Sequence, residues 1–181
     1  KLFKVKNELF LSIETFSTNS IIFCCFSHMT TENKFPDLNR YKLISKIGEG
    51  AFSKVYRVKD SETNIYYAAK VANLVVDEDS VDSQDSRLLF REVNLISMLN
   101  HPAVLKFVGY YQTDFENEPK PTIVTELATR GSLKDVIEME ISSISPYDWN
   151  DTKKLINIYG IASGMSYLQS HKILHLNLTD S

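Results

Sequence analysis

The residues with the clearest chemical meaning in this sequence are two glycines, Gly48 and Gly50, and a lysine, Lys70. Because glycine has no Cβ, a hairpin built on these two positions can bring bare backbone N–H groups against an anion. Lys70 ends a stretch of strand-forming residues, 64–69, so we expect its ammonium to be carried by a strand and not by a loop. A fixed cation beside a glycine-lined anion nest is the arrangement that a polyphosphate needs.

The residues that follow the glycines favour a phosphate loop set between two strands. Phe52 lies at the expected tip, where its ring can fold back over a ligand, and Val55 resumes a strand and offers an apolar surface. Dinucleotide-binding folds also use a Gly-x-Gly, but their loop leads into a helix and brings no lysine at this spacing. Here residues 52–58 continue as a strand, which argues against a dinucleotide site.

The segment from Ile47 to Lys70 resembles the glycine-rich loop and the strand lysine of the eukaryotic protein kinase family. Ser53 stands where the family has its third glycine. The resemblance implies that the ligand is ATP and that Lys70 binds its α- and β-phosphates. The loop positions that it assigns to ATP binding are Ile47, Gly48, Gly50, Phe52, Ser53 and Val55.

A helix is expected after the acidic stretch 77–85, which we interpret as a solvated loop. Glu92 lies inside the apolar face of that helix, where a carboxylate is costly unless it is paired. It is either solvated at the edge of the stripe or, as the resemblance favours, paired with Lys70 to hold the lysine against the phosphates. The residues that recur at the three- and four-residue spacing of a helix are Leu88, Leu89, Glu92, Val93, Ile96 and Leu99.

The resemblance implies an α+β, protein-kinase-like fold that is truncated. The resemblance implies a five-stranded antiparallel N-lobe sheet with the family's helix C, then a hinge and the first C-lobe helices, D and E. The expected strands are 41–47, 52–60, 64–72, 104–111 and 121–127, with a turn at 60–64; the expected helices are 132–138, capped by Ser132, and about 150–171. In the last helix a stripe of apolar residues predicts a face turned to the core: Leu155, Ile158, Ile161, Ala162, Met165 and Leu168.

The domain division follows from these elements. We expect residues 1–40 to be a poorly ordered N-terminal extension and residues 41–181 to be an incomplete kinase domain, with its N-lobe at 41–127 and a partial C-lobe at 128–181. Residues 1–28 are either a genuine extension or translated non-coding sequence upstream of Met29.

The hinge between the lobes is expected to bind adenine. By the resemblance, Thr125 is the gatekeeper, and the backbone groups of Glu126 and Ala128 form hydrogen bonds with the base. Ala68 and Val55 are expected to pack on the upper face of the adenine ring. The sequence around this hinge looks most like the tyrosine-kinase-like branch of the serine/threonine kinases.

Residues 172–181 resemble the family's catalytic loop, H-R-D-L-x-x-x-N, with several departures. His175 matches the histidine, Leu176 replaces the arginine, Asn177 replaces the catalytic aspartate, and Thr179 stands where a lysine is usual. An amide has no comparable basicity, so Asn177 can orient a hydroxyl but cannot take its proton. General-base catalysis typically contributes on the order of 10²–10⁴ in rate, so we expect very weak transfer.

Three functional interpretations remain open at this point. The first is an ATP-binding, Ser/Thr-type protein kinase domain present as a fragment, with a protein substrate and with magnesium only if a longer chain supplies the metal ligands expected after Ser181. The second is a pseudokinase that binds a partner protein as a scaffold. The third is the product of a decaying gene copy that does not fold well.

Composition sets the outer limits of these interpretations. The chain has 181 residues, 43% of them hydrophobic, which is enough for a packed core, and its net charge of -3 argues against a nucleic-acid binder. The two cysteines, Cys24 and Cys25, are adjacent and cannot build a disulfide framework, so a reducing, cytoplasmic location is expected. No apolar run approaches the length of a membrane span.

Overall fold

The computed structural model describes residues 36–50, 53–73, 93–129 and 131–173. Contacts divide the chain into two compact units. The sheet unit contains the described residues between 36 and 99 together with 106–127, and the helical unit contains 100–105 and the described residues from 128 onward. Each unit has its own architecture.

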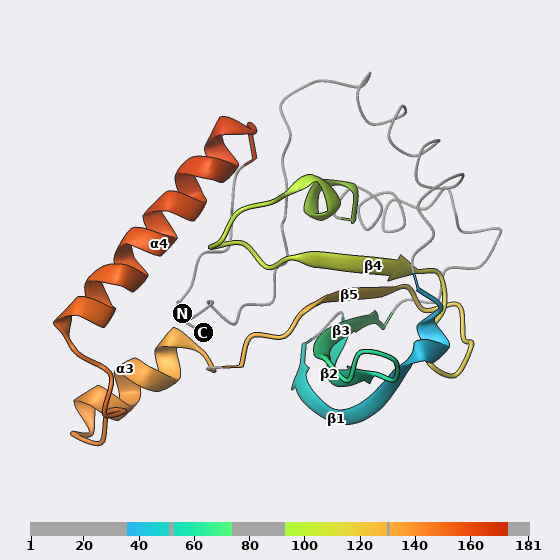
Figure 1. The fold of residues 1–181 in the computed structure, drawn as a ribbon, viewed down its shortest axis with the longest axis horizontal. Helices are drawn as coiled ribbons and strands as arrows, with labels where there is room; N and C mark the ends of the chain where they lie inside the picture. Colours follow the sequence, from blue (N-terminus) through green and yellow to red (C-terminus); the bar gives the residue numbers. More distant parts are fainter. Residues whose placement is uncertain (1–35, 51–52, 74–92, 130, 174–181) are drawn as a thin grey trace. The chain divides into compact units, whose positions relative to one another are not determined.

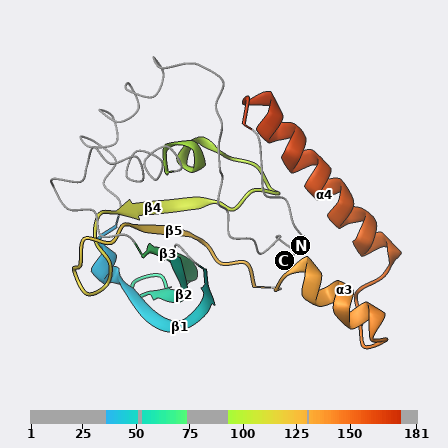
Figure 2. The same ribbon diagram turned by 180° about the vertical axis from the view of Figure 1, so that it is seen from behind.

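The sheet unit is built on five antiparallel strands in the order β1-β2-β3-β5-β4. The strands are β1 (Tyr41–Glu49), β2 (Ser53–Asp60), β3 (Tyr66–Ala72), β4 (Phe107–Tyr111) and β5 (Thr122–Glu126). β1 and β4 form the two edges (Figures 1 and 2). The predicted five-stranded antiparallel sheet is therefore confirmed, although β4 begins three residues later than its apolar pattern indicated.

One face of this sheet carries the hydrophobic core. Val58, Ala69 and Val124 are fully buried and come from three neighbouring strands. Tyr41 packs edge-on against Tyr67, with ring centroids 5.7 Å apart. Such a contact between large rings contributes about 0.5–1.5 kcal/mol beyond the area that it buries.

The segment before β1 takes part in this core. Residues Leu38–Arg40 form a short 3-10 helix, η1, whose first turn is capped by Asp37, and Leu38 is buried in the core. The hydroxyl of Tyr111 donates a hydrogen bond of 2.7 Å to the carbonyl of Pro36. The sequence places residues 36–40 in the extension, yet in the structure they contribute the core side chain of Leu38 and the Pro36 carbonyl that accepts from Tyr111.

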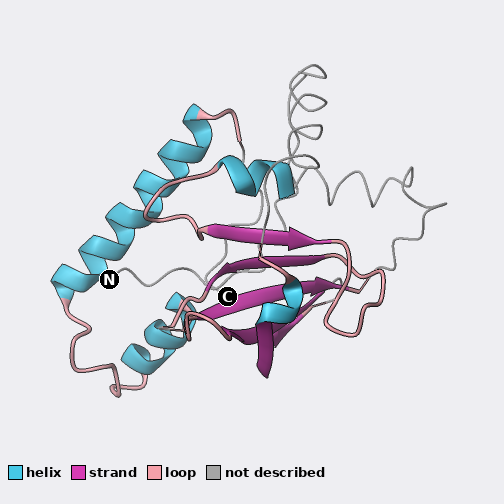
Figure 3. Cartoon of the chain, turned by 45° about the vertical axis from the view of Figure 1, so that its right-hand side comes forward, coloured by secondary structure: helices cyan, strands magenta, loops and turns pink. Residues whose placement is uncertain are grey.

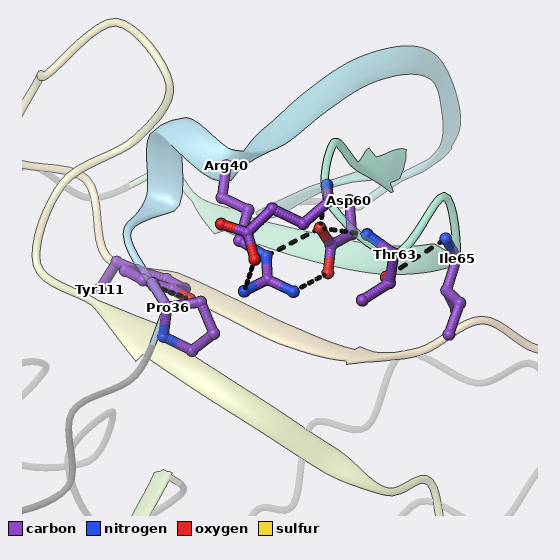
Figure 4. Close-up of polar contacts among 7 residues, drawn as sticks. Pro36, Arg40, Asp60, Thr63, Ile65 and Tyr111 are labelled. Atoms are coloured by element: carbon purple, nitrogen blue, oxygen red, sulfur yellow. Dashed lines mark hydrogen bonds and ion pairs between the residues drawn. The ribbon is translucent and has the colours of Figure 1, made fainter.

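A charged cluster joins the start of β1 to the turn between β2 and β3. The guanidinium of Arg40 donates two hydrogen bonds, of 2.7 and 2.6 Å, to the buried carboxylate of Asp60 (Figure 4). Asp60 also accepts hydrogen bonds from the backbone N–H groups of Glu62 and Thr63, and Asn64 takes the positive φ that the turn requires. The predicted turn at 60–64 is thus confirmed and is built around Asp60.

The helix predicted before residue 100 is described only at its end. Residues 93–98 are helical, and Val93 and Ile96 are buried, as is Leu99 directly after them. These three agree with the predicted apolar stripe. The earlier part of the stripe lies outside the described residues.

The helical unit contains α3 (Leu133–Ile141) and α4 (Asp151–Ser170), coloured as helices in Figure 3. Ser132 begins α3 with a capping box: its hydroxyl accepts from the backbone N–H of Asp135, whose carboxylate accepts from the N–H of Ser132. The side chain of Asn150 caps α4 by accepting from the N–H of Lys153. Both helix starts agree with the sequence, and α3 extends three residues beyond its predicted end.

The expected core-facing stripe of α4 is wrong for three of its members, Leu155, Ile158 and Ala162, which are exposed. Leu155 and Ile158 are 66% and 64% exposed, whereas the buried residues of α4 are Asn157, Gly160, Gly164 and Leu168. The reason is steric, because a Cβ at Gly164 would lie only 3.3 Å from Ala103. The side of the helix with small residues therefore fits closely against the segment 100–105.

The segment 100–105 is also fixed to α4 by polar and aromatic contacts. The N–H of Asn100 donates to the hydroxyl of Tyr167 at 3.0 Å, and His101 stacks on the Tyr167 ring with centroids 4.9 Å apart. The Nε2 atom of His101 lies 3.2 Å from the hydroxyl of Ser163. None of the helices in the described part of the chain is long and apolar enough to span a bilayer.

Candidate functional site

The register of the strands places the predicted ligand-binding residues on one face of the sheet. In an antiparallel pair, residues directly opposite each other point to the same side. Lys70 in β3 is paired with Val55 in β2 and with Ile123 in β5. One row along, Ala68 is paired with Thr125. We call the side of the sheet that carries these residues the lysine face.

The lysine face is opposite the hydrophobic core. Along β3 the burial alternates: Ala69 and Val71 are buried, whereas Ala68 and Lys70 between and beside them are partly buried. Ala69 belongs to the core cluster and anchors the strand from behind. Lys70 is therefore carried by a strand whose other side is packed.

Of the two glycines, Gly48 lies near the end of β1 and Gly50 begins the turn between β1 and β2. Gly48 is paired with Val55, and the N–H of Gly50 donates a hydrogen bond of 2.9 Å to the carbonyl of Ser53. The side-chain amide of Asn73, just after β3, reaches the carbonyl of Gly50 at 3.5 Å. The base of the turn is thus tied to the strand that carries Lys70, although the tip, residues 51–52, lies outside the described residues.

Space above Gly48 is limited by a single apolar neighbour. A Cβ added at this glycine would meet the side chain of Val55 at 3.6 Å, which is an ordinary van der Waals contact. An alanine would therefore fit in the sheet, and its methyl group would occupy space beside Val55. With glycine at this position, the space beside Val55 stays unfilled.

The predicted hinge residues are held by a set of local hydrogen bonds. The N–H of Glu126 donates to the carbonyl of Lys106 at 3.0 Å, while the N–H of Lys106 donates to the carboxylate of Glu126 at 2.8 Å. The hydroxyl of Thr125 donates to the carbonyl of Glu126 at 3.2 Å. The resemblance assigns a role only to the backbone of Glu126, and no sequence signal points to this role of its side chain. Ala128, the remaining hinge residue, belongs to the helical unit.

Four of the predicted site residues lie outside the described residues. These are Phe52 at the loop tip, Glu92, and the catalytic-loop residues His175 and Asn177. The pairing of Lys70 with Glu92 and the roles given to His175 and Asn177 therefore stay predictions. In the part of the chain that the structure describes, no group of three or more His, Cys, Asp or Glu side chains could hold a metal ion.

Ionisable groups with shifted pKa values lie behind and beside this face. Hydrogen bonds from Arg40 hold the pKa of the Asp60 carboxyl well below its usual range. Burial raises the pKa of Tyr110, which is paired with Ile123 on the lysine face, to about 12. Tyr110 therefore stays neutral at physiological pH.

A family model described as "Protein kinase domain" matches residues 41–181. A probable serine/threonine-protein kinase of Dictyostelium discoideum is 26% identical over 144 residues, which cover 80% of this chain and 26% of the relative. Serine/threonine-protein kinase 33 of Mus musculus is 29% identical over 132 residues, covering 73% of this chain and 24% of the relative.

A third relative matches this chain with similar identity and coverage. Serine/threonine-protein kinase polo of Drosophila melanogaster is 27% identical over 149 residues, or 81% of this chain and 24% of the relative. The chain thus spans about a quarter of the length of these curated relatives. Because the family model covers most of the sequence, and because the sheet has the strand order and the lysine strand described above, the chain belongs to the protein kinase family.

Proposed function

We propose that this chain is the ATP-binding part of a Ser/Thr-type protein kinase, an ATP:protein phosphotransferase, with a deficient transfer step. The observation that carries the proposal is the register that brings Val55, Lys70 and Ile123 into one row and Ala68 and Thr125 into the next. A cation, an apolar platform and a polar gatekeeper then share one face of the sheet.

The residues of the lysine face fit the parts of ATP. Val55 and Ala68 offer a flat apolar surface for the adenine ring, because neither side chain reaches far from the strand. The carbonyl of Glu126 accepts a hydrogen bond from the hydroxyl of Thr125, and the resemblance assigns the backbone of Glu126 to the base. The ammonium of Lys70 and the bare backbone at Gly48 suit the phosphates. Magnesium enters the proposal only where further residues supply its ligands.

The deficiency rests on the sequence of the catalytic loop. Asn177 stands where the family has its aspartate, and an amide cannot accept the proton of a substrate hydroxyl. In a protein long enough to contain the metal ligands, Asn177→Asp is expected to raise phosphate transfer to a generic Ser/Thr substrate by on the order of 10²–10⁴. Rapid transfer that survives Asn177→Ala would contradict this part of the proposal.

A scaffold function is the second candidate. Its supporting observation is that the departures from the family pattern gather at Leu176, Asn177 and Thr179, whereas Gly48, Gly50 and Lys70 are retained. A pseudokinase of this kind would bind ATP and a partner protein without phosphate transfer.

The hinge sequence, residues 123–126 and 131–133, supports the tyrosine-kinase-like branch for both candidate functions. We also propose a cytoplasmic location, from the use of cysteine alone.

Thermal unfolding with ATP tests the nucleotide site directly. A ligand at one hundred times its Kd stabilises a protein by about 2.7 kcal/mol, which corresponds to roughly 5–10 °C for a chain of this size. We expect such a shift, and we expect Lys70→Met to remove it, whereas Lys134→Met on the exposed side of α3 should leave it unchanged. An absence of any shift at millimolar ATP would refute the nucleotide site. A shift without transfer after Asn177→Asp would favour the scaffold.

A further inference from the structure

A group of basic residues surrounds an aromatic ring at the far end of β1 and β2. The group consists of Lys42, Arg57, Lys59 and Tyr66, and we call it the cationic platform. Lys42 is paired with Lys59, and Lys59 with Tyr66, so these three form one row across three strands. Arg57 is paired with Ala68 in the adjacent row. All four therefore lie on the lysine face, beyond the positions assigned to ATP.

The ring of Tyr66 fixes two of the cations. The Cζ atom of Arg57 lies 4.1 Å from the ring centroid, and the Nζ atom of Lys59 lies 5.7 Å from it. Both distances fall within the range in which a cation is attracted to the face of an aromatic ring. The contact with the Tyr66 ring therefore restrains the positions of the charges on Arg57 and Lys59. Tyr66 keeps 39% of its surface exposed, so its ring is accessible as well.

The platform is not balanced by acidic side chains in the described part of the chain. Lys42, Arg57 and Lys59 form no ion pair with a described residue, whereas Arg40 and Lys46 each do. The nearest acids along β2 and its turn, Asp60 and Glu62, are both bound to Arg40. The Nε atom of Arg57 is buried and has no hydrogen-bond partner among the described residues.

This arrangement costs stability in the absence of a partner. Like charges directly opposite each other on neighbouring strands, such as Lys42 and Lys59, destabilise a sheet. A buried donor without an acceptor, such as the Nε of Arg57, adds a further cost. An anion on the platform would relieve the repulsion between the lysines, because carboxylate oxygens accept from lysine donors.

We propose that the cationic platform is a docking surface for an acidic peptide segment of a partner protein. The platform offers only three positive charges, and the chain as a whole carries -3, which disfavours a long polyanion or an anionic membrane. The exposed part of the Tyr66 ring provides an apolar contact beside these charges. The partner segment should therefore alternate acidic with apolar residues. The proposal does not depend on ATP binding.

The test is binding of a labelled peptide to the whole chain. The probe is a fluorescein-labelled peptide of alternating Glu and Leu, followed by anisotropy, with the Gln and Leu peptide as its neutral counterpart. We expect saturable binding of the Glu peptide that weakens with salt and falls at least about tenfold in Lys42→Glu/Lys59→Glu. The matched control, Lys106→Glu/Lys134→Glu, changes the net charge equally at exposed positions elsewhere and should alter the affinity less than about twofold.

Further variants and probes distinguish peptide docking at the platform from binding at the ATP site, from loss of fold and from binding of other anions. Lys70→Met should leave peptide binding intact, so a failure of the ATP site and a failure of the platform are distinguishable. Lys42→Glu alone should also weaken peptide binding, but it places opposite charges across the strands and should not lower Tm, so its loss of binding is not a loss of fold. Equal binding of the neutral peptide, equal losses in the control variant, or tighter binding of an oligonucleotide or of phosphatidylserine vesicles than of the Glu peptide would overturn the proposal.

Discussion

Asp60 carries the sharpest stability prediction for the sheet unit. Its carboxylate is 2% exposed and accepts four hydrogen bonds, two from Arg40 and one each from the N–H groups of Glu62 and Thr63. Asp60→Asn keeps an oxygen for the backbone donors but places an amide N–H₂ against the guanidinium, where two donors face each other. The substitution thus removes a charge-assisted pair and adds a repulsive contact.

The magnitude follows from the burial of this pair. Breaking a buried ion pair by removing one partner costs roughly 3–5 kcal/mol. The Arg40 side chain is 23% exposed, and without Asp60 it still has its ion pair with Glu62. The lower end of that range therefore applies to the loss of Asp60. We expect a loss of about 3 kcal/mol in the free energy of unfolding, equivalent to roughly 6–12 °C in Tm. The control is Glu62→Gln, whose carboxylate is 70% exposed and should contribute about 0–1 kcal/mol.

The dependence on pH gives a second, independent measurement. The hydrogen bonds from Arg40, and then those of the turn, hold the pKa of Asp60 below its value in the unfolded chain, which is about 3.9. A carboxyl with a lowered pKa contributes stability that is present above the unfolded value and is lost as the pH falls through the folded value. The difference between the natural chain and Asp60→Asn should therefore be complete at neutral pH and shrink in acid.

The assay is urea unfolding at neutral pH and at several acidic values, with hydrogen exchange of the peptides that cover 53–73. Faster exchange should appear first in β2 and in the turn after it. The reasoning fails if Asp60→Asn and Glu62→Gln have the same free energy of unfolding at neutral pH. It also fails if their difference persists unchanged into strong acid.

Three further predictions concern the hinge and the helical unit. Glu126→Ala leaves the N–H of Lys106 without its acceptor, so the free energy of unfolding should fall by about 1 kcal/mol, and Glu126→Gln should restore most of it in urea titrations. Gly164→Leu forces a side chain into the 3.3 Å contact with Ala103 and should cost roughly 2 kcal/mol, read as a lower Tm. Ser132→Ala removes the capping box of α3 and should cost about 1 kcal/mol, seen as faster amide exchange in its first turn.

The positions of the strands along the chain could be predicted because they rest on local signals. Turn-forming residues at 60–64 separate two strands, and the positive φ of Asn64 explains why an asparagine suits that position. The side of β3 on which Lys70 lies also follows from alternation, since Ala69 and Val71 occupy the other side. These features need only neighbouring residues, so the sequence contains them.

The contacts between distant residues could not be predicted in this way. The pair of Arg40 with Asp60 joins two positions with no periodic relation, and the same holds for Tyr111 with Pro36. In α4, periodicity identified an apolar stripe but could not tell which side of the helix would be covered. The close approach of Ala103 to Gly164 decided that, because backbone packing against a glycine needs no apolar pattern.

The lysine face and the hydrophobic core lie on opposite faces of the same sheet. A change in the core that shifts the strands should therefore also move the residues of the proposed ATP site. A slip of β3 by one residue would bring Ala69 to the lysine face and turn Lys70 into the core. Overpacking a core position typically costs 1–3 kcal/mol and shifts the backbone around it. Ala69→Leu should accordingly lower Tm and weaken ATP binding together, although Ala69 points away from the ligand. Ala162→Leu, on the exposed side of α4, should change neither, and full ATP affinity in the Ala69→Leu variant would show that the register is not what positions the lysine.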